Sequence, residues 1–71
     1  MDRVPIASSN IAEAGYDETS QTLEIMFQDG RIYQYFDVPV NIFESLKNSG
    51  DLTPGKFFHA HIKGIFRYTR L

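Results

Sequence analysis

The stretch Thr22-Leu-Glu-Ile-Met-Phe-Gln28, Asp29-Gly30, Arg31-Ile-Tyr-Gln-Tyr-Phe36 decides the fold of this chain. Apolar and polar residues alternate on both sides of Asp29-Gly30, which is typical of strands with one buried face. Asp-Gly between two such runs favours a two-residue type I′ turn, in which both residues have positive φ. We therefore predict an antiparallel hairpin over residues 22–36.

A two-residue turn determines which side chains share a face of the hairpin. It pairs Phe27 with Ile32 and Met26 with Tyr33, and a shift of one residue would turn every side chain of a strand to the other face. The predicted core face carries Leu23, Ile25, Phe27, Ile32 and Phe36. The opposite face carries Glu24, Met26, Gln28, Arg31, Tyr33 and Tyr35. The turn thus predicts that both tyrosines project away from the core.

The segments around the hairpin predict two helices. Apolar residues at positions 42, 43 and 46 form one stripe on a short helix over residues 40–47, which residues 48–50 would end. Thr53-Pro54 suits the start of a second helix, because threonine caps the first turn and proline tolerates its first position. Phe58, His61 and Ile62 would share its apolar side, and Gly64 would close it.

The remaining segments complete an antiparallel sheet. Residues 9–16 alternate weakly and predict a strand, residues 65–71 have strand-like composition, and residues 1–8 are expected to form a flexible arm. Helices this short are stable only when packed, so both should cover the apolar face of the hairpin. We therefore expect a small α+β fold in the order β-β-β-α-α-β, with residues 9–71 as its one domain.

Composition restricts the class of protein. A chain of 71 residues with no cysteine and 42% hydrophobic residues is typical of one small soluble domain in a reducing compartment. The first residues lack the apolar run of a secretion signal, and no segment is long enough to cross a bilayer. We expect a cytoplasmic protein without a membrane partner. A core this small makes self-association or a partner more probable.

Basic residues concentrate at the C-terminal end. Residues 1–51 contain all nine acidic residues and three of the seven basic ones, whereas residues 52–71 contain only basic charges: Lys56, Lys63, Arg67 and Arg70. This segment could face phosphates, or it could balance the acidic remainder of the folded chain. Lys56 is also predicted to lie at a helix start, where free N–H groups attract anions.

Several short motifs resemble the KTSC domain family. The resemblance lies in Tyr33-Gln34-Tyr35 after a hairpin, Pro39 before a short helix, Gly55-Lys56-Phe57-Phe58, His61-Ile62-Lys63-Gly64 and a closing Tyr68. It covers about residues 8–71. Members of that family occur as small bacterial or phage proteins and at the C-terminus of some lysyl-tRNA synthetases. The resemblance implies a suspected role in RNA binding and no established activity.

The two tyrosines allow three interpretations. Two aromatic side chains on an uncovered sheet face could stack unpaired bases while Arg31 holds a phosphate. Both rings could instead pack within the fold with their hydroxyl groups at its edge. With Met26 they could also form a dimer interface, since tyrosine and methionine are enriched where subunits meet.

Neither a metal site nor a catalytic site is indicated. His59 and His61 would point in nearly opposite directions on a helix and could share an ion only on a strand, and no third ligand accompanies them. We expect His61 in the core and His59 exposed. No nucleophile motif, phosphate-binding glycine loop or paired carboxylates point to an enzyme.

We therefore expect a binding module without a cofactor or metal, whose partner is RNA, either tRNA or a single strand. The candidate binding residues are Arg31, Tyr33, Tyr35, Lys56, His59, Lys63, Arg67, Tyr68 and Arg70. A protein partner or homodimer using the same tyrosines, and a pocket for a small nucleotide, are the alternatives.

Overall fold

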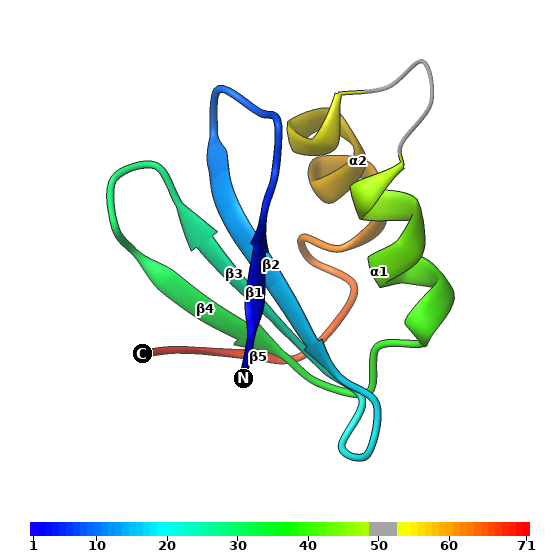
Figure 1. Ribbon diagram of the computed structural model, residues 1–71. Coiled ribbons are helices and arrows are strands. Elements are labelled where there is room, and N and C mark those ends of the chain that lie inside the picture. Colours follow the sequence, from blue (N-terminus) through cyan, green and yellow to red (C-terminus); the bar gives the residue numbers. More distant parts are fainter. Residues whose placement is uncertain (49–52) are drawn as a thin grey trace.

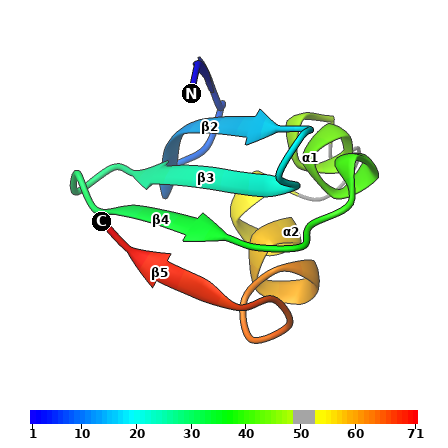
Figure 2. The same cartoon turned by 90° about the horizontal axis from the view of Figure 1, so that it is seen from below.

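A computed structural model describes residues 1–48 and 53–71 and shows one antiparallel sheet covered by two helices. The strands are β1 (Arg3–Pro5), β2 (Ile11–Asp17), β3 (Thr22–Phe27), β4 (Ile32–Tyr35) and β5 (Tyr68–Arg70). They lie in the sheet in the order β1-β2-β3-β4-β5. Helices α1 (Val40–Lys47) and α2 (Pro54–His61) pack on the same face of this sheet, and no described helix covers the other face, which is called the uncovered face below (Figures 1 and 2). The α+β class and its two layers are confirmed.

Both helices begin where the sequence predicts. The first spans Val40–Lys47, the same bounds as the predicted helix. The Thr53 side chain accepts a hydrogen bond from the Lys56 N–H, and Pro54 occupies the first turn of α2. The predicted end of α1 at residues 48–50 lies partly outside the described residues. Each helix has eight residues, and no helix among residues 1–48 and 53–71 is long and apolar enough to cross a bilayer.

The register of the β3–β4 hairpin differs from the prediction by one residue. The turn has three residues, since the Phe27 N–H donates to the Arg31 carbonyl and the Gly30 N–H donates to the Phe27 carbonyl. Gly30 has a φ of 91°, and no positive φ is found at Asp29 in this described turn. This is a type I turn followed by a glycine bulge, which suits Asp-Gly as well as the predicted type I′ turn does.

The shifted register reverses the predicted faces of β4. Ile25 now lies opposite Tyr33 and Leu23 opposite Tyr35. Both tyrosines therefore belong to the face that the helices cover, and the prediction that they project away from the core was wrong. Ile32 and Phe36, predicted to lie in the core, belong to the uncovered face and are half-buried.

The core lies between the sheet and the two helices. Ile11, Leu23 and Ile25 of the sheet are fully buried, as are Leu46 of α1 and Ile62 directly after α2. Tyr35 is 4% exposed and joins this core. His61, predicted to be buried, is exposed. Phe58 and Ile62 are buried as predicted, and Phe57 is buried where His61 was expected to be.

The N-terminal residues extend the sheet instead of forming a flexible arm. Strand β1 pairs with β2, and Ile6 is buried. Arg3 lies opposite Gly15 in the register, and its guanidinium passes over that glycine to reach Glu24 at 2.8 Å and Glu13 at 2.9 Å. Gln34 donates a further hydrogen bond to Glu24, which is 7% exposed. This row of side chains anchors β1 on the uncovered face.

Gly15 is the position at which this anchoring can be tested. A methyl group there would lie 2.5 Å from the Asp2 carbonyl oxygen and 3.0 Å from Arg3 Cγ, so the backbone of the first residues would have to move. We expect Gly15→Ala to lower the free energy of unfolding by about 1–3 kcal/mol, as overpacking does. Urea denaturation followed by circular dichroism measures this change.

Gly55→Ala is the matched control for Gly15→Ala. A methyl group at Gly55, in α2, would lie 3.8 Å from its nearest neighbours, which is an ordinary contact. Alanine is also the better helix former, so stability should be equal or slightly higher. If Gly15→Ala is as stable as the parent chain, the close approach of the Asp2 carbonyl to Gly15 is wrong.

Candidate functional site

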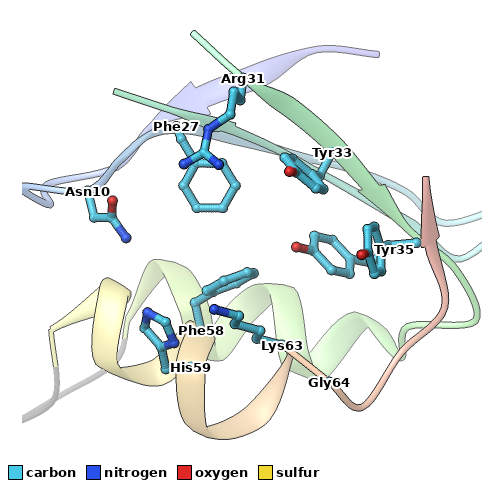
Figure 3. A pocket seen from close by; sticks show the side chains of 10 residues that line it. Asn10, Phe27, Arg31, Tyr33, Tyr35, Phe58, His59, Lys63 and Gly64 are labelled. Carbon is cyan, nitrogen blue, oxygen red and sulfur yellow. The ribbon is translucent and has the colours of Figure 1, made fainter. Parts of the chain in front are cut away.

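A pocket of about 280 Å³ opens between the sheet and α2, at the end of the sheet where the β3–β4 turn lies. The sheet side is formed by Phe27, Arg31, Tyr33, Tyr35 and Tyr68. The opposite side is formed by Phe58 and His59 of α2 and by Lys63 and Gly64 after it, and Asn10 closes one end (Figure 3). The three-residue turn creates this site, because it places Tyr33 and Tyr35 on the face that looks toward α2.

The rings around the pocket form one continuous cluster. Phe58 of α2 contacts both Phe27 and Tyr35 edge to face, with ring centroids 5.4 Å and 5.6 Å apart. Tyr33 and Tyr35 lie nearly parallel, 18° apart in plane, with centroids separated by 6.4 Å. Tyr68 lies 5.6 Å from Tyr33 and 61% of it is exposed, so its ring is both part of the pocket and open to solvent. The pocket wall therefore offers aromatic surface to a flat ligand.

Cationic side chains surround this aromatic surface. Arg31 and Lys63 line the pocket from opposite walls, His59 lies beside Lys63, and the lining of this pocket contains no acidic residue. The Arg31 guanidinium lies 5.6 Å from the centre of the Phe27 ring, and its Nε donates to Asp29 at 2.7 Å. A planar ligand that carries negative charge fits such a lining.

Asp29 holds the arginine of the pocket in place. Its carboxylate accepts a hydrogen bond from the Arg31 backbone N–H at 3.1 Å, in addition to the bond from Nε. The backbone hydrogen bond from Arg31 is the largest of the effects that lower the pKa of Asp29, and the charges of Arg31 and Arg70 add to it. Asp29 therefore stays ionised and fixes Arg31 at the mouth of the pocket.

The structure brings six of the nine predicted binding residues together. Arg31, Tyr33, Tyr35, His59, Lys63 and Tyr68 line the pocket. The other three do not line it. Lys56 is exposed on the first turn of α2, where its N–H is already bonded to Thr53, so the predicted anion position there has lost one donor.

The two remaining arginines occupy different surroundings. Arg67 donates to Asp37 at 3.0 Å and lies over the Phe36 ring. It therefore agrees with the second of the two interpretations of the basic segment, in which its charges balance the acidic remainder of the folded chain. Arg70 lies opposite Tyr33 in the β4–β5 register, which puts it on the same face as the pocket tyrosines. Its charge also acts on Asp29 at the hairpin turn.

Four lining residues were not among the predicted ones, and one of them, Gly64, was predicted only to close the second helix. Phe58 was assigned to the core only, and Phe27 was assigned to the core face, where it also lies. Asn10 comes from the loop before β2, and nothing in its neighbouring sequence marks it. Met26, which was grouped with the tyrosines, lies on the opposite face of the sheet, as Ile32 does, its partner in the register. Among residues 1–48 and 53–71, no group of three potential metal ligands is found.

The fold and sequence match known proteins over nearly the whole chain. The structure is similar to the crystal structure of a KTSC domain protein from Yersinia pestis, with a TM-score of 0.87, 37% identity and coverage of 99% of this chain and 96% of that one. The family model of the KTSC domain matches residues 7–68. The chain belongs to the KTSC domain family. The resemblance found in the sequence motifs is thereby confirmed, over nearly the same residues.

Relatives of this KTSC domain include both large and small proteins. It is 43% identical over 63 residues to a lysine–tRNA ligase of Trichormus variabilis and 45% identical over 56 residues to one of Nostoc sp.. The matches cover 89% and 79% of this chain but only 11% and 10% of those ligases. A protein of Tsukamurella paurometabola is 36% identical, and the match covers 94% of this chain and 97% of the relative.

The buried pocket tyrosine has a measurable signature. Burial, with smaller effects from Tyr33 and Tyr68, raises the pKa of Tyr35 to about 12, whereas a tyrosine in an unfolded chain has a pKa of about 10. The folded state thus holds this proton more tightly. The contribution of Tyr35 to stability is therefore complete below about pH 10 and is lost as the pH rises towards 12.

We expect Tyr35→Phe to reduce the pH dependence of the urea denaturation midpoint between about pH 10 and 12, because phenylalanine has no proton to lose. The ring is kept, so the variant should still unfold cooperatively at neutral pH. An unchanged pH dependence in this range would show that the Tyr35 hydroxyl is not buried against α2.

Proposed function

We propose that this KTSC domain is a non-enzymatic RNA-binding module whose pocket takes one unstacked base of an unpaired strand. The observation that carries the proposal is the juxtaposition of aromatic rings with Arg31, His59 and Lys63 in one pocket. Single-stranded RNA is commonly recognised by splayed bases that stack on aromatic side chains, with cations on the phosphates. In this role the base lies against Tyr33 and Tyr68, and the flanking phosphates meet Arg31 and Lys63.

The size of the pocket supports one base at a time. The pocket volume of about 280 Å³ lies just below the range of roughly 300–1,000 Å³ that is usual for small-molecule sites. A duplex cannot enter such a space, so the site selects loops, bulges or strand ends. The lysine–tRNA ligases that contain a similar segment act, by their name, on a tRNA, whose loops and end offer such unpaired bases.

The geometry favours this role over a protein interface on the tyrosines. The predicted dimer interface needs Tyr33, Tyr35 and Met26 together on one open surface. Tyr35 is only 4% exposed, however, and Met26 lies on the other face of the sheet. A free nucleotide would use the same pocket but lacks the flanking phosphates. Comparing uridine monophosphate with a pentauridine strand separates the two: equal affinities would favour the free nucleotide.

Tyr68 provides a test of stacking that spares the fold. Because 61% of it is exposed, Tyr68→Ala should leave folding intact. Stacking of a base on an aromatic side chain contributes about 1–3 kcal/mol, so the dissociation constant for pentauridine should rise roughly 5- to 150-fold. Fluorescence anisotropy with a labelled strand at low salt measures it.

Ile65→Ala is the matched control for Tyr68→Ala. Ile65 is equally exposed at 61%, lies three residues away and does not line the pocket. Its substitution should change the dissociation constant less than about twofold, well below the stacking effect. If the parent chain does not bind the strand even at low salt, the proposed function is wrong.

The cations of the pocket can be tested through salt dependence. We expect Lys63→Ala and Arg31→Ala each to weaken binding and to reduce the slope of log affinity against log salt by roughly 0.7, the value for one phosphate of a single strand. Lys47→Ala is the control, since Lys47 lies on α1, where it pairs with Glu44 at 3.3 Å. An equal effect of all three substitutions would indicate a diffuse charge effect instead of a binding site.

A further inference from the structure

Strand β5 is an open edge of the sheet. It is the last strand in the sheet order, and all three of its residues are exposed (Figure 2). The Arg67 carbonyl and the Leu71 N–H both bond to residues 32–36, so the backbone groups of alternate residues face β4. Those of Tyr68 and Arg70 therefore point out of the sheet, where no described strand pairs with them. Such a row of groups is a template for a further strand.

Apolar side chains gather at the same edge. Ile65 and Tyr68 are each 61% exposed, and Leu71 is 65% exposed. Beside them lies an open hollow whose lining includes Phe36, Ile65, Arg67 and Tyr68. Exposed apolar residues that cluster in this way mark an interaction surface, whereas single ones do not.

The opposite edge of the sheet is protected against pairing. Strand β1 contains Pro5, which has no N–H to donate, and proline is a common means of blocking an edge strand. The Arg3 side chain of that strand is held by Glu13 and Glu24. Strand β5 contains no proline. The edge at which a strand can add is therefore that of β5.

The residues of β5 match a second copy of the same strand. When two copies run antiparallel about a two-fold axis at Thr69, Tyr68 of each copy lies opposite Arg70 of the other. Both residues have outward backbone groups, so each pair can form two hydrogen bonds. Their side chains share one face of the sheet, where a guanidinium can lie over a tyrosine ring.

Neighbouring registers fit less well. An axis at Arg70 would place two like charges opposite each other, and an axis at Tyr68 would pair Arg70 with Phe66, which lies outside the strand. The axis at Thr69 also brings Leu71 of each copy opposite Arg67 of the other, beside the hollow of that copy. Charge and apolar surface are then both matched.

We propose that two copies of this chain pair through β5, antiparallel and centred on Thr69, and join their sheets into one. Arg70 of each copy then adds a cation beside Tyr68 of the other, at the edge of its pocket. Because three residues of each copy pair, the interface is small and the dissociation constant should be roughly 1 μM to 1 mM. The inference does not rest on the proposed function, since no RNA takes part in the pairing.

A single introduced cysteine tests the register, because the chain contains no cysteine of its own. In the proposed dimer Thr69 lies opposite itself at a position without hydrogen bonds, where the two Cα atoms are about 4.5 Å apart and a disulfide can form. In a glutathione buffer, Thr69→Cys should form a disulfide-linked dimer at least about 10-fold faster than Thr19→Cys, as non-reducing electrophoresis measures. Thr19 is the matched control, since it is an exposed threonine in the turn between β2 and β3.

Sedimentation velocity tests the dimer without a crosslink. Between about 10 μM and 1 mM the parent chain should pass from monomer towards dimer. Arg70→Pro removes an outward N–H that β4 does not use, so it should keep the circular dichroism spectrum and stay monomeric. Arg70→Ala keeps that N–H and should dimerise more weakly than the parent chain.

Three results would overturn the proposal. A parent chain that is monomeric at 1 mM would leave the edge to a strand of another protein. Equal crosslinking of Thr69→Cys and Thr19→Cys, or a folded Arg70→Pro that dimerises as the parent chain does, would place any dimer contact elsewhere on the surface.

Discussion

The three-residue turn between β3 and β4 is the constraint on which the site depends. Asp29 lacks the positive φ that a type I′ turn requires and Gly30, with a φ of 91°, forms the bulge, so the turn is one residue longer than predicted and β4 is shifted by one place against β3. That shift turns Tyr33 and Tyr35 toward α2 instead of away from it. Because the same turn presents Asp29 to Arg31, it also fixes the guanidinium at the mouth of the pocket. One backbone conformation thus determines both the aromatic wall and one of its cations.

Local signals in the sequence were sufficient to predict most helices and strands, but they did not predict which face of β4 is buried. The stripe at positions 42, 43 and 46 predicted α1 with its observed bounds, and Thr53-Pro54 predicted the start of α2. The hairpin itself was also predicted correctly. Its register was not, because Asp-Gly suits two turn types and because either face of β4 is apolar enough to be buried: Ile32 and Phe36 on one, Tyr33 and Tyr35 on the other. Only packing against α2 distinguishes them.

The sequence predicted most residues of the candidate site, but it did not predict how they are arranged around the pocket. Six of the nine predicted residues meet in one pocket, yet the reason given for the tyrosines, an open sheet face, was wrong. The basic segment divides according to its neighbours: Lys63 faces the rings, whereas Arg67 is paired with Asp37. Asn10 could not be found from the sequence, since its place in the pocket follows from contacts with Gln28 and α2 that are distant along the chain.

Nuclear Overhauser effects between the labelled domain and a bound single strand of RNA test the central claim most directly. The account predicts contacts from base protons to the rings of Tyr33, Phe58 and Tyr68, on the face of the sheet that α2 covers. Contacts to Ile32 and Phe36, on the uncovered face, would contradict it, because RNA would then bind the surface that the shifted register turns away from the pocket.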